Sequence, residues 1–319
     1  MPSYAKRGIV MKYAIYKLYF STGVHIGVDS LTDGEYVINS DTIFSALCHE
    51  ALKLGASQKL EKLVALAKDN LILLSDGLPF IKNELYLPKP LKPATIEEEG
   101  NSIQKKAFKK LKYIPVSKIH TYMKGKLNPE YEGEIFKALG KYTLRTQAWV
   151  RGTDEAKPYS VGLYKFSEGN GIYICIAYTR DEDLHFVDRL IHSLSYTGIG
   201  GKRSAGLGKF TYEVTEPPKE LLKSLNEESA KTYMTLSICL PHEDEIEAAL
   251  VGAYYLLNKR SGFVSSLTYS DTSLKKKDFY AFKSGSCFTK KFNGDIYDLS
   301  YKGNHPVYRY AKAMFMGVE

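Results

Sequence analysis

The chain has 319 residues, of which 44% are hydrophobic, and its formal net charge is +8 at pH 7. This length and composition are typical of a globular protein with a substantial core and room for two domains, and they exclude a disordered or fibrous chain. The positive charge favours a polyanionic partner such as nucleic acid, although an excess of lysine also aids solubility.

The cysteines and the N-terminus bear on where the protein works. No two of the four cysteines form a C-x-x-C pair, which speaks against a zinc knuckle and a disulfide framework; they are Cys48, Cys175, Cys239 and Cys287. Lys12 and Lys17 interrupt the apolar run over 9–20, so we expect no signal peptide. No run approaches the roughly 18 apolar residues of a membrane helix. We therefore expect a protein of the reducing cytoplasm with no membrane partner.

The first part of the chain predicts alternating strands and helices. Aromatic and β-branched runs indicate strands, and apolar residues three and four positions apart indicate helices. We expect a strand over 13–20, a helix from Ser40 or Asp41 that Gly55 ends, a helix over 57–68, a short strand over 71–74, and a strand or hairpin arm over 80–87. Further on, we expect a strand over 142–150, a hairpin of 159–166 with 172–178, a helix over 181–195 and a strand over 209–214.

Between these elements, the stretch from about 93 to 142 is charged, rich in lysine and low in apolar periodicity. We read it as a partly mobile insertion that projects from its domain. Without the insertion, the order of elements is β-α-β…β-α-β, which is the split βαβ or ferredoxin-like arrangement. Two helices are then expected on one face of an antiparallel sheet.

The second part of the chain follows a proline-marked boundary near 217. We expect an N-terminal extension over 1–10, a first domain over 11–215 with the insertion, and a second, degenerate ferredoxin-like domain over 216–319. Its expected elements are a helix over 218–225, a strand over 233–240, a helix over 243–257, and strands over 278–282, 287–292, 296–299 and 307–316.

A glycine-rich loop, YTGIGGKRSAGLGKF over 196–210, is the clearest functional signal. Its candidate phosphate-binding residues are Gly198, Gly200, Gly201, Lys202, Arg203, Ser204, Gly206 and Gly208. Successive backbone N–H groups in such a loop form an anion-attracting nest, and the adjacent cations favour an RNA or DNA backbone. A flexible turn before a strand explains the glycines equally well. The loop lacks the Lys-Ser/Thr of a Walker P-loop, and it follows a helix where a Rossmann fingerprint follows a strand.

Two further groups are candidates for RNA contact. Arg145 and Arg151 flank Trp149, so one strand could grip phosphates and stack a base, although a core tryptophan between solvated arginines is as good an explanation. His25, in a small-residue turn that begins at Gly23, could act as a general base in RNA cleavage. A structural or base-stacking histidine is the better interpretation, because no second acid–base group has a matching position. The histidines lack metal-ligand spacing, so we predict no metal and no cofactor.

Several segments resemble one protein family. The loop GIGGKRSAGLGKF closely resembles that of the repeat-associated (RAMP) proteins of CRISPR systems. Other segments are similar to one branch of these proteins, the fourth Csm subunit of the type III-A CRISPR–Cas effector complex. They are YFSTGVHIGVDSL, VINSDTIFSALCHEALKLG, LYLPKPL, KRSGFVSS, KKKDFYAFKSGSCF and YRYAKAMFMGV. The resemblance covers both halves of the chain in the same order.

This resemblance implies an α+β fold of two ferredoxin-like (RRM-like) domains with glycine-rich loops and an inserted thumb-like segment. It implies a non-catalytic subunit of an antiviral complex that caps the 5′ repeat-derived handle of CRISPR RNA. Its implied protein partners are the large polymerase-type Csm subunit and the backbone Csm subunit that cleaves target RNA. The positions carried over are those of the glycine loop, together with the Gly23–His25 turn and the helix start at Ser40 and Asp41.

Two alternatives remain open at this point. One is a metal-independent RAMP endoribonuclease that cuts CRISPR repeat RNA with His25 as general base and Lys202 or Arg203 stabilising the transition-state charge. The other is a protein-interaction module whose basic charge is incidental.

Overall fold

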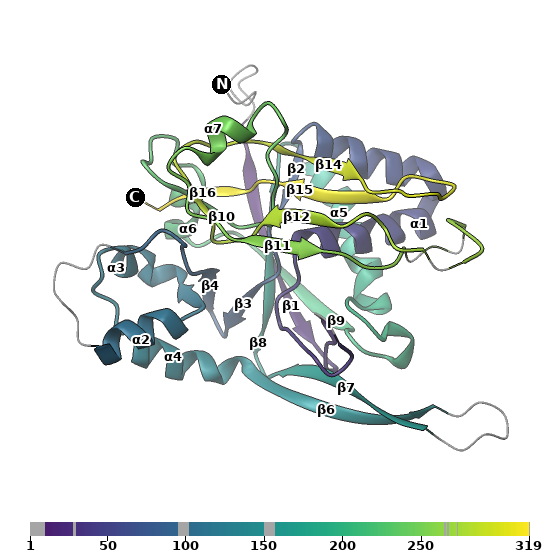
Figure 1. Cartoon of the computed structure of the whole chain (residues 1–319), viewed down its shortest axis with the longest axis horizontal. Coiled ribbons are helices and arrows are strands. Elements are labelled where there is room, and N and C mark those ends of the chain that lie inside the picture. The colour runs from purple at the N-terminus through teal and green to yellow at the C-terminus, as the bar shows by residue number, and fades with distance from the viewer. Residues whose placement is uncertain are drawn as a thin grey trace.

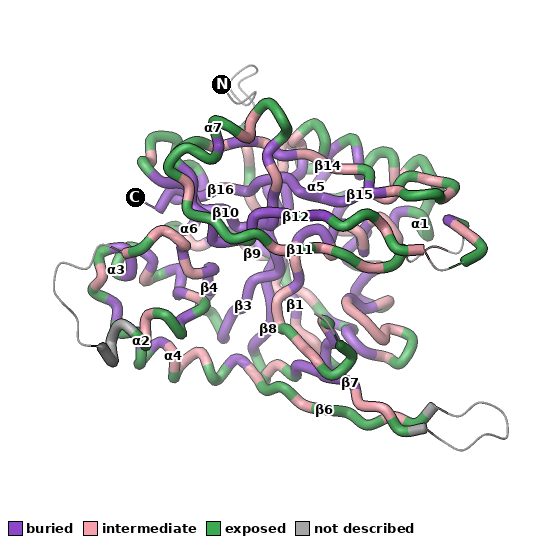
Figure 2. Tube along the Cα trace, in the orientation of Figure 1, coloured by how far each residue is buried: buried purple, intermediate pink, exposed green. Residues whose placement is uncertain are grey.

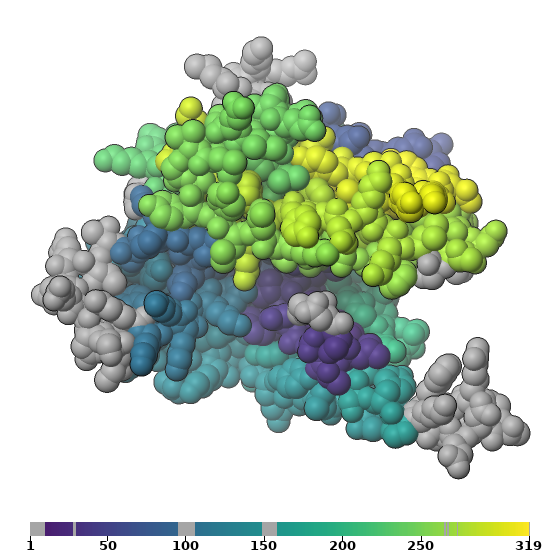
Figure 3. All heavy atoms as spheres, viewed as in Figure 1, coloured from purple at the N-terminus to yellow at the C-terminus, as the bar shows by residue number. Residues whose placement is uncertain are grey.

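A computed structural model of the chain describes residues 10–27, 30–94, 102–149, 157–264, 266, 268–272 and 274–318, without the side chains of 102–105, 149 and 157. Almost all of the expected N-terminal extension lies outside these ranges. The fold mixes helices and strands (Figure 1). Figure 3 shows the C-terminal half, in green to yellow, over the upper part of one face, and N-terminal residues, in purple to teal, below it.

The centre of the molecule is an antiparallel sheet with the strand order β5-β4-β3-β8-β1-β9. Its strands are β1 (Lys12–Phe20), β3 (Leu78–Ile81), β4 (Glu84–Pro88), β5 (Tyr113–Pro115), β8 (Asn170–Tyr178) and β9 (Phe210–Thr215), while β2 (Ile72–Leu74) pairs with β8 off this path. Strands are present where the first half was expected to have them, but the single strand or hairpin arm expected over 80–87 is instead a hairpin of two strands, β3 and β4.

Both faces of this sheet are covered. On one face, Tyr16, Ile174 and Ile176 pack against the helices α1 (Ser40–Lys68) and α5 (Asp181–Thr197). On the other face, Ile15 and Tyr173 share a core with residues of the insertion and of the C-terminal half. Eight of the nine residues of β8 are buried as a result (Figure 2).

The break expected at Gly55 is confirmed. Gly55 and Ala56 have non-helical backbone angles within α1, and Ala56 has a φ of 55°. The segment is therefore two helices joined at a kink. The side chains that point from it into the core include Phe44, Leu47 and Leu63, as the apolar spacing predicted.

The insertion contains more regular structure than its sequence pattern indicated. Its elements are α2 (Ser102–Lys110), β5, the 3-10 turns η2 (Val116–Lys118) and η3 (Lys137–Leu139), α3 (Ile119–Met123) and α4 (Pro129–Phe136). Strand β5 extends the central sheet, and Ile114, Ile119 and Tyr122 are buried in its core. The described part of the insertion is thus a helical lobe on the sheet edge. Its short helices carry too few turns for a clear apolar period.

The element that extends furthest from the body is a two-stranded ribbon of β6 (Gly140–Trp149) and β7 (Lys157–Phe166) (Figure 1). The predicted hairpin of 159–166 with 172–178 is wrong, because β7 pairs with β6 over its whole length. Strand β8 instead has β1 on one edge and β2 and β3 on the other. A strand with so many buried residues needs neighbours on both edges, which a single hairpin partner cannot supply.

The C-terminal half consists mainly of short strands in small sheets. Its elements are α6 (Lys219–Leu225), β10 (Tyr233–Thr235), α7 (Ile246–Leu250), β11 (Leu257–Arg260), β12 (Phe279–Phe282), β13 (Cys287–Phe288), β14 (Gly294–Asp298), β15 (Tyr308–Lys312) and β16 (Phe315–Gly317). The helix predicted over 243–257 is wrong beyond 250. Gly252 has a φ of 65°, and Tyr254 already pairs with Cys287 in an extended conformation.

The described residues lack both a membrane-spanning helix and a metal-binding cluster. Within the ranges given above, no helix combines the length and the apolar character that crossing a membrane requires. The same residues contain no group of three or more His, Cys, Asp or Glu side chains that could hold a metal ion.

Candidate RNA interface

The glycine-rich loop joins α5 to β9, as the sequence predicted. Gly198, Gly200, Gly206 and Gly208 all have φ between 73° and 95°, a region that side chains with a Cβ rarely occupy. Lys202 also has a positive φ of 58°, so the chain reverses sharply at the centre of the loop.

Most of the loop glycines serve to pack the loop onto its neighbours. A Cβ on Gly208 would lie 2.0 Å from the Ile199 carbonyl oxygen, and one on Gly200 would lie 2.6 Å from the His25 carbonyl oxygen. A Cβ on Gly206, by contrast, would meet no atom within 4 Å. Gly206 is therefore required only for its backbone angles, whereas Gly200 and Gly208 are also required for close approach.

The backbone N–H groups of the loop are only partly available to a ligand. Gly201 donates to the His25 carbonyl at 2.8 Å, and Gly208 donates to the Gly23 carbonyl at 3.1 Å. The expectation of a nest formed by the glycine N–H groups is corrected in this respect. Among the described residues, no acceptor faces the N–H groups of Lys202, Arg203 and Ser204, and these three remain for an anion.

The two loop cations take different directions. The Nζ atom of Lys202 lies 5.0 Å from the centroid of the Tyr159 ring on β7, a cation–π contact. Arg203 lies towards α1, where burial and then the charge of Arg203 lower the pKa of His49. Both side chains are half-buried, while Ser204 is exposed at the tip of the loop. Lys202 and Arg203 therefore extend the positive potential of the loop to either side.

Gly23 and His25 lie beneath the loop. His25 is only 6% exposed, and its Nδ1 atom donates to the Gly162 carbonyl at 2.7 Å. The ring also lies against Gly201, where an added Cβ would come within 2.6 Å of its Cδ2 atom. Together with the Val24–Tyr164 bridge, these contacts join the turn to both the loop and the ribbon. The buried ring and its hydrogen bond to the Gly162 carbonyl agree with the preferred interpretation of His25 as a structural histidine, and they do not fit a base exposed on the surface.

A groove of about 660 Å³ lies between the ribbon, the end of β1 and the loop. The ribbon contributes Thr143, Arg145 and Lys165 to its lining, and the loop contributes Ala205 to Leu207. The turn after β1, over 21–23, closes it, and Gly23 thus lies in its wall. The structure therefore brings together three of the sequence-predicted elements, namely the loop, the Gly23 turn and the strand of Arg145.

The cations around the groove lack carboxylate partners. Lys141, Arg145, Lys165 and Lys209 are exposed, and none of them forms an ion pair with any residue that the structure describes. Lys141 lies directly opposite Lys165 in the ribbon. Like charges in such a cross-strand position destabilise the pair, and a bound polyanion would relieve that repulsion.

The position of Arg145 follows from the register of the ribbon. Arg145 lies opposite Val161, so their side chains share one face, and Val161 packs with Leu207 of the loop. That face is therefore apolar where it meets the loop and cationic at its outer edge. Lys141 and Lys165 were missed by sequence reasoning, which had paired β7 with the wrong strand. The available signal was the two-residue period of a strand, which places Lys141 and Arg145 on the same face of β6.

Trp149 and Arg151 stay predictions. Trp149 is the last residue of β6, with its side chain outside the described part, and Arg151 lies wholly outside the described residues.

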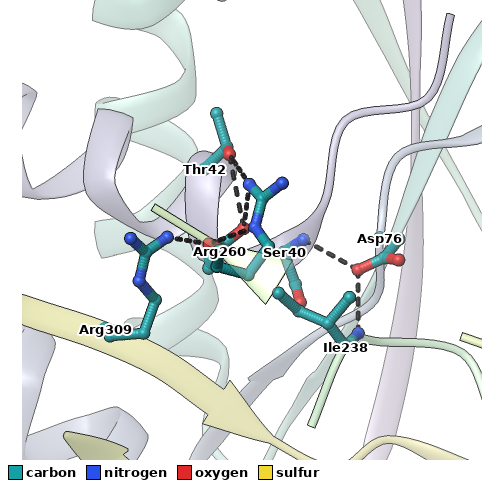
Figure 4. Close-up of polar contacts among 7 residues, drawn as sticks. Ser40, Thr42, Asp76, Ile238, Arg260 and Arg309 are labelled. Atoms are coloured by element: carbon teal, nitrogen blue, oxygen red, sulfur yellow. Dashed lines mark hydrogen bonds and ion pairs between the residues drawn. The ribbon is translucent and has the colours of Figure 1, made fainter. Parts of the chain in front are cut away.

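Ser40 and Asp41 do not belong to this surface. Asp41 is 1% exposed, and Arg260 donates to its two carboxylate oxygens at 3.0 and 2.9 Å, while Arg309 pairs with it from the C-terminal half (Figure 4). Burial alone would raise the pKa of Asp41, but the two guanidinium groups outweigh it and hold the pKa below its ordinary value. The expectation that this helix start contacts RNA is therefore corrected.

The same helix start is tied to the C-terminal half by a second carboxylate. Asp76 accepts hydrogen bonds from the backbone N–H groups of Ser40 at 2.8 Å and Ile238 at 3.0 Å (Figure 4). Burial raises the pKa of Asp76 to about 6, although these hydrogen bonds favour the ionised form. Ser40 and Asp41 thus act in joining the two halves of the chain.

Comparison with known proteins gives consistent matches along the chain. Residues 17–211 match the RAMP superfamily, and residues 228–318 match the CRISPR Csm4 C-terminal domain. The chain is 36% identical over 295 residues to the CRISPR system Cms protein Csm4 of Mycobacterium tuberculosis (strain ATCC 25618 / H37Rv), covering 92% of this chain and 94% of that one. It is 32% identical over 314 residues to the Csm4 protein of Streptococcus thermophilus, covering 95% and 99%.

Solved structures show the same fold. A Csm3–Csm4 subcomplex of the type III-A CRISPR–Cas interference complex matches with a TM-score of 0.65 at 20% identity, over 96% of this chain and 98% of that chain. A Csm1–Csm4 cassette in complex with AMPPNP matches with a TM-score of 0.60 at 18% identity, over 97% and 98%.

Proposed function

The chain belongs to the Csm4 family of the RAMP superfamily, the Csm4 proteins of type III CRISPR complexes, and from this premise we propose that it is a non-catalytic RNA-binding subunit. It caps the complex by holding the 5′ repeat-derived handle of CRISPR RNA. It also links a large Csm1-type subunit to the Csm3-type subunits of the backbone, since Csm4 proteins have been solved with each of these partners.

The proposal includes two ferredoxin-like domains, over 11–215 and 216–319. The order β3-β8-β1-β9 with α1 and α5 on one face supports the first of them, since it is the order of a split βαβ unit. The second is degenerate, because α7 spans only five residues. A boundary near 216 is compatible with the two family matches, which end at 211 and begin at 228.

The observation that carries the RNA-binding function is the groove with its free cations. Arg145 and Lys165 line it directly, and neither is neutralised by a carboxylate within the described chain. The N–H groups of Lys202 to Ser204 lie at the loop that forms the opposite wall. Single-stranded RNA is bound by this combination of phosphate neutralisation and open backbone donors. Bases splayed away from the phosphates are then free for stacking and edge contacts.

The ribbon takes the part of the thumb-like segment in this proposal. It is the element that extends from the body, and it forms one wall of the groove (Figure 1). The lysine-rich insertion, to which the sequence assigned that part, is a lobe on the opposite edge of the sheet from β9. The ribbon therefore contacts the RNA at the point where the RNA strand leaves the groove towards the next subunit.

The test is a double substitution in the groove, Arg145→Ala with Lys165→Ala. Binding of a labelled 5′-handle RNA is measured over a series of salt concentrations. Loss of two phosphate contacts to single-stranded RNA makes the negative slope of log K against log salt less steep by about 1.4. The matched control is Lys219→Ala with Lys223→Ala on α6, which removes the same charge from exposed positions outside the groove.

The outcome separates the proposal from its competitors. An unchanged slope in the groove variant would remove the groove from the RNA site. An equal decrease in RNA affinity in both double variants would mean that only the net charge affects binding, as expected for a protein-interaction module with incidental basicity.

A further inference from the structure

A second exposed surface lies in the C-terminal half, in the segment that leads from α7 into β11. Its apolar side chains are between 37% and 63% exposed, namely Leu250, Val251, Tyr254, Tyr255, Leu256 and Leu257. Figure 2 shows this stretch as a nearly continuous exposed path from α7 to β11. Tyr280 on the neighbouring strand β12 is 51% exposed and extends the surface. A run of exposed apolar side chains along one segment indicates an interaction site, whereas single scattered ones do not.

The backbone of the same segment is an open strand edge. Tyr254 pairs with Cys287 through both its N–H and its carbonyl, and the Leu256 carbonyl accepts from Lys283 at 2.8 Å. Backbone hydrogen bonds to one neighbour are made by every second residue of an antiparallel strand. The N–H and carbonyl groups of Tyr255 and Leu257 therefore point away from 283–287, towards the open edge. In the described part of the chain, no strand pairs with that edge of β11.

The first part of this edge, over 254–257, lacks the usual protection, and a lysine follows only at Lys259. Proteins cover free edges with lysine, proline, bulges or another element. Residues 254–257 contain neither lysine nor proline, and their side chains are apolar on both faces of the strand. Exposed backbone groups between exposed apolar side chains are the arrangement that accepts an added β-strand.

We propose that a β-strand of the large Csm1-type subunit adds to this edge. Its side chains would be apolar where they meet Leu256 and Leu257, and acidic towards the opposite end, beyond Arg260, where Lys275 and Lys277 are exposed. RNA does not suit the apolar part of the edge, because residues 250–257 carry no cation to neutralise phosphates.

The choice between the two protein partners rests on the proposed function. The RNA passes from the groove to the Csm3-type subunit, so that subunit docks beside the β6–β7 ribbon. Strand β11 lies in the other half of the molecule (Figure 1). The open edge of β11 is therefore assigned to the Csm1-type subunit.

The test compares Leu257→Asp with Val214→Asp in the full-length chain. Both side chains are exposed and lie on sheet-edge strands, and Val214, on β9, is the control. A charge placed in the centre of an interface weakens binding of the purified Csm1-type subunit by roughly 10-fold or more for Leu257→Asp. The control retains the wild-type Kd, and handle RNA binds equally to both variants, which separates this test from that of the groove.

Hydrogen exchange on the wild-type chain tests the strand addition without any variant. Complex formation slows exchange over 254–260, and most strongly at the amides of Tyr255 and Leu257, which face the open edge. An unchanged Kd for a folded Leu257→Asp, or unchanged exchange over 254–260 in the complex, overturns the proposal. So does a wild-type chain that forms a dimer through this edge by itself, or a Leu257→Asp variant that loses RNA binding while it keeps the Csm1-type subunit.

Discussion

Alanine substitutions at two loop glycines distinguish backbone angle from close approach. Gly206 and Gly208 have similar φ values of 81° and 73°, so a Cβ costs both of them about 1–2 kcal/mol in backbone conformation. The difference lies in space, since a Cβ on Gly206 meets nothing within 4 Å. Gly206→Ala is therefore expected to lower the free energy of unfolding by the conformational cost alone.

Gly208→Ala carries an additional cost. Its Cβ would lie 2.0 Å from the Ile199 carbonyl oxygen, so the backbone there has to move. The movement breaks the hydrogen bonds from Ile199 to Gly208 at 3.0 Å and from Gly208 to Gly23 at 3.1 Å. With about 1 kcal/mol for each lost bond and a further penalty for buried groups left unpaired, the cost exceeds that of Gly206→Ala by roughly 2–3 kcal/mol.

Thermal unfolding and RNA titration measure the two effects. For a chain of this size, 1 kcal/mol corresponds to roughly 2 °C in Tm, so Gly208→Ala melts about 4–6 °C below Gly206→Ala. Gly208→Ala also weakens binding of handle RNA, because the displaced loop is a wall of the groove, whereas Gly206→Ala leaves it unchanged. Equal Tm values for the two variants would refute the reasoning. Loss of RNA binding by a stable Gly206→Ala would instead place Gly206 in direct contact with RNA.

Three further outcomes are expected. Asp41→Asn leaves Arg260 and Arg309 buried without a counter-charge and lowers the free energy of unfolding by about 3–5 kcal/mol in urea titrations, and a loss below 1 kcal/mol would contradict the buried pairing. Burial raises the pKa of Asp76 in the folded state from 3.8 to about 6, so between these pH values the folded state binds more protons than the unfolded state. The free energy of unfolding therefore falls as the pH rises from about 4 to 6. Asp76→Asn removes this pH dependence, and a pH dependence that persists in the variant would exclude Asp76 as its source. Labelled repeat RNA incubated with the chain in EDTA stays intact, and cleavage that disappears in a His25→Gln variant would replace the non-catalytic function with the endoribonuclease alternative.

Local patterns were sufficient to predict much of the fold. The strand β1, the kink at Gly55 and the place of the glycine loop between α5 and β9 all follow from apolar spacing and from glycine. The family resemblance, which also came from local segments, is confirmed.

Long-range pairing could not be predicted from the same patterns. The partners of Asp41 lie 219 and 268 positions away along the chain, so a carboxylate at a helix start looked like a surface feature. The register of β6 with β7 likewise decides which cations line the groove, and neither strand's own sequence contains it. The loop glycines illustrate the same limit, because composition indicated a tight turn but not which N–H groups the neighbouring turn already occupies.

The buried contacts of Asp41 have a practical consequence for how the protein can be divided. The prolines near 217 look like a natural point for truncation, but a fragment ending there would lack both of the arginines that pair with this carboxylate. The same fragment would expose the face of the central sheet that Met234, Leu236 and Met316 cover. The N-terminal half is therefore expected to aggregate when it is expressed alone, and co-expression of the C-terminal half as a separate chain should restore its solubility.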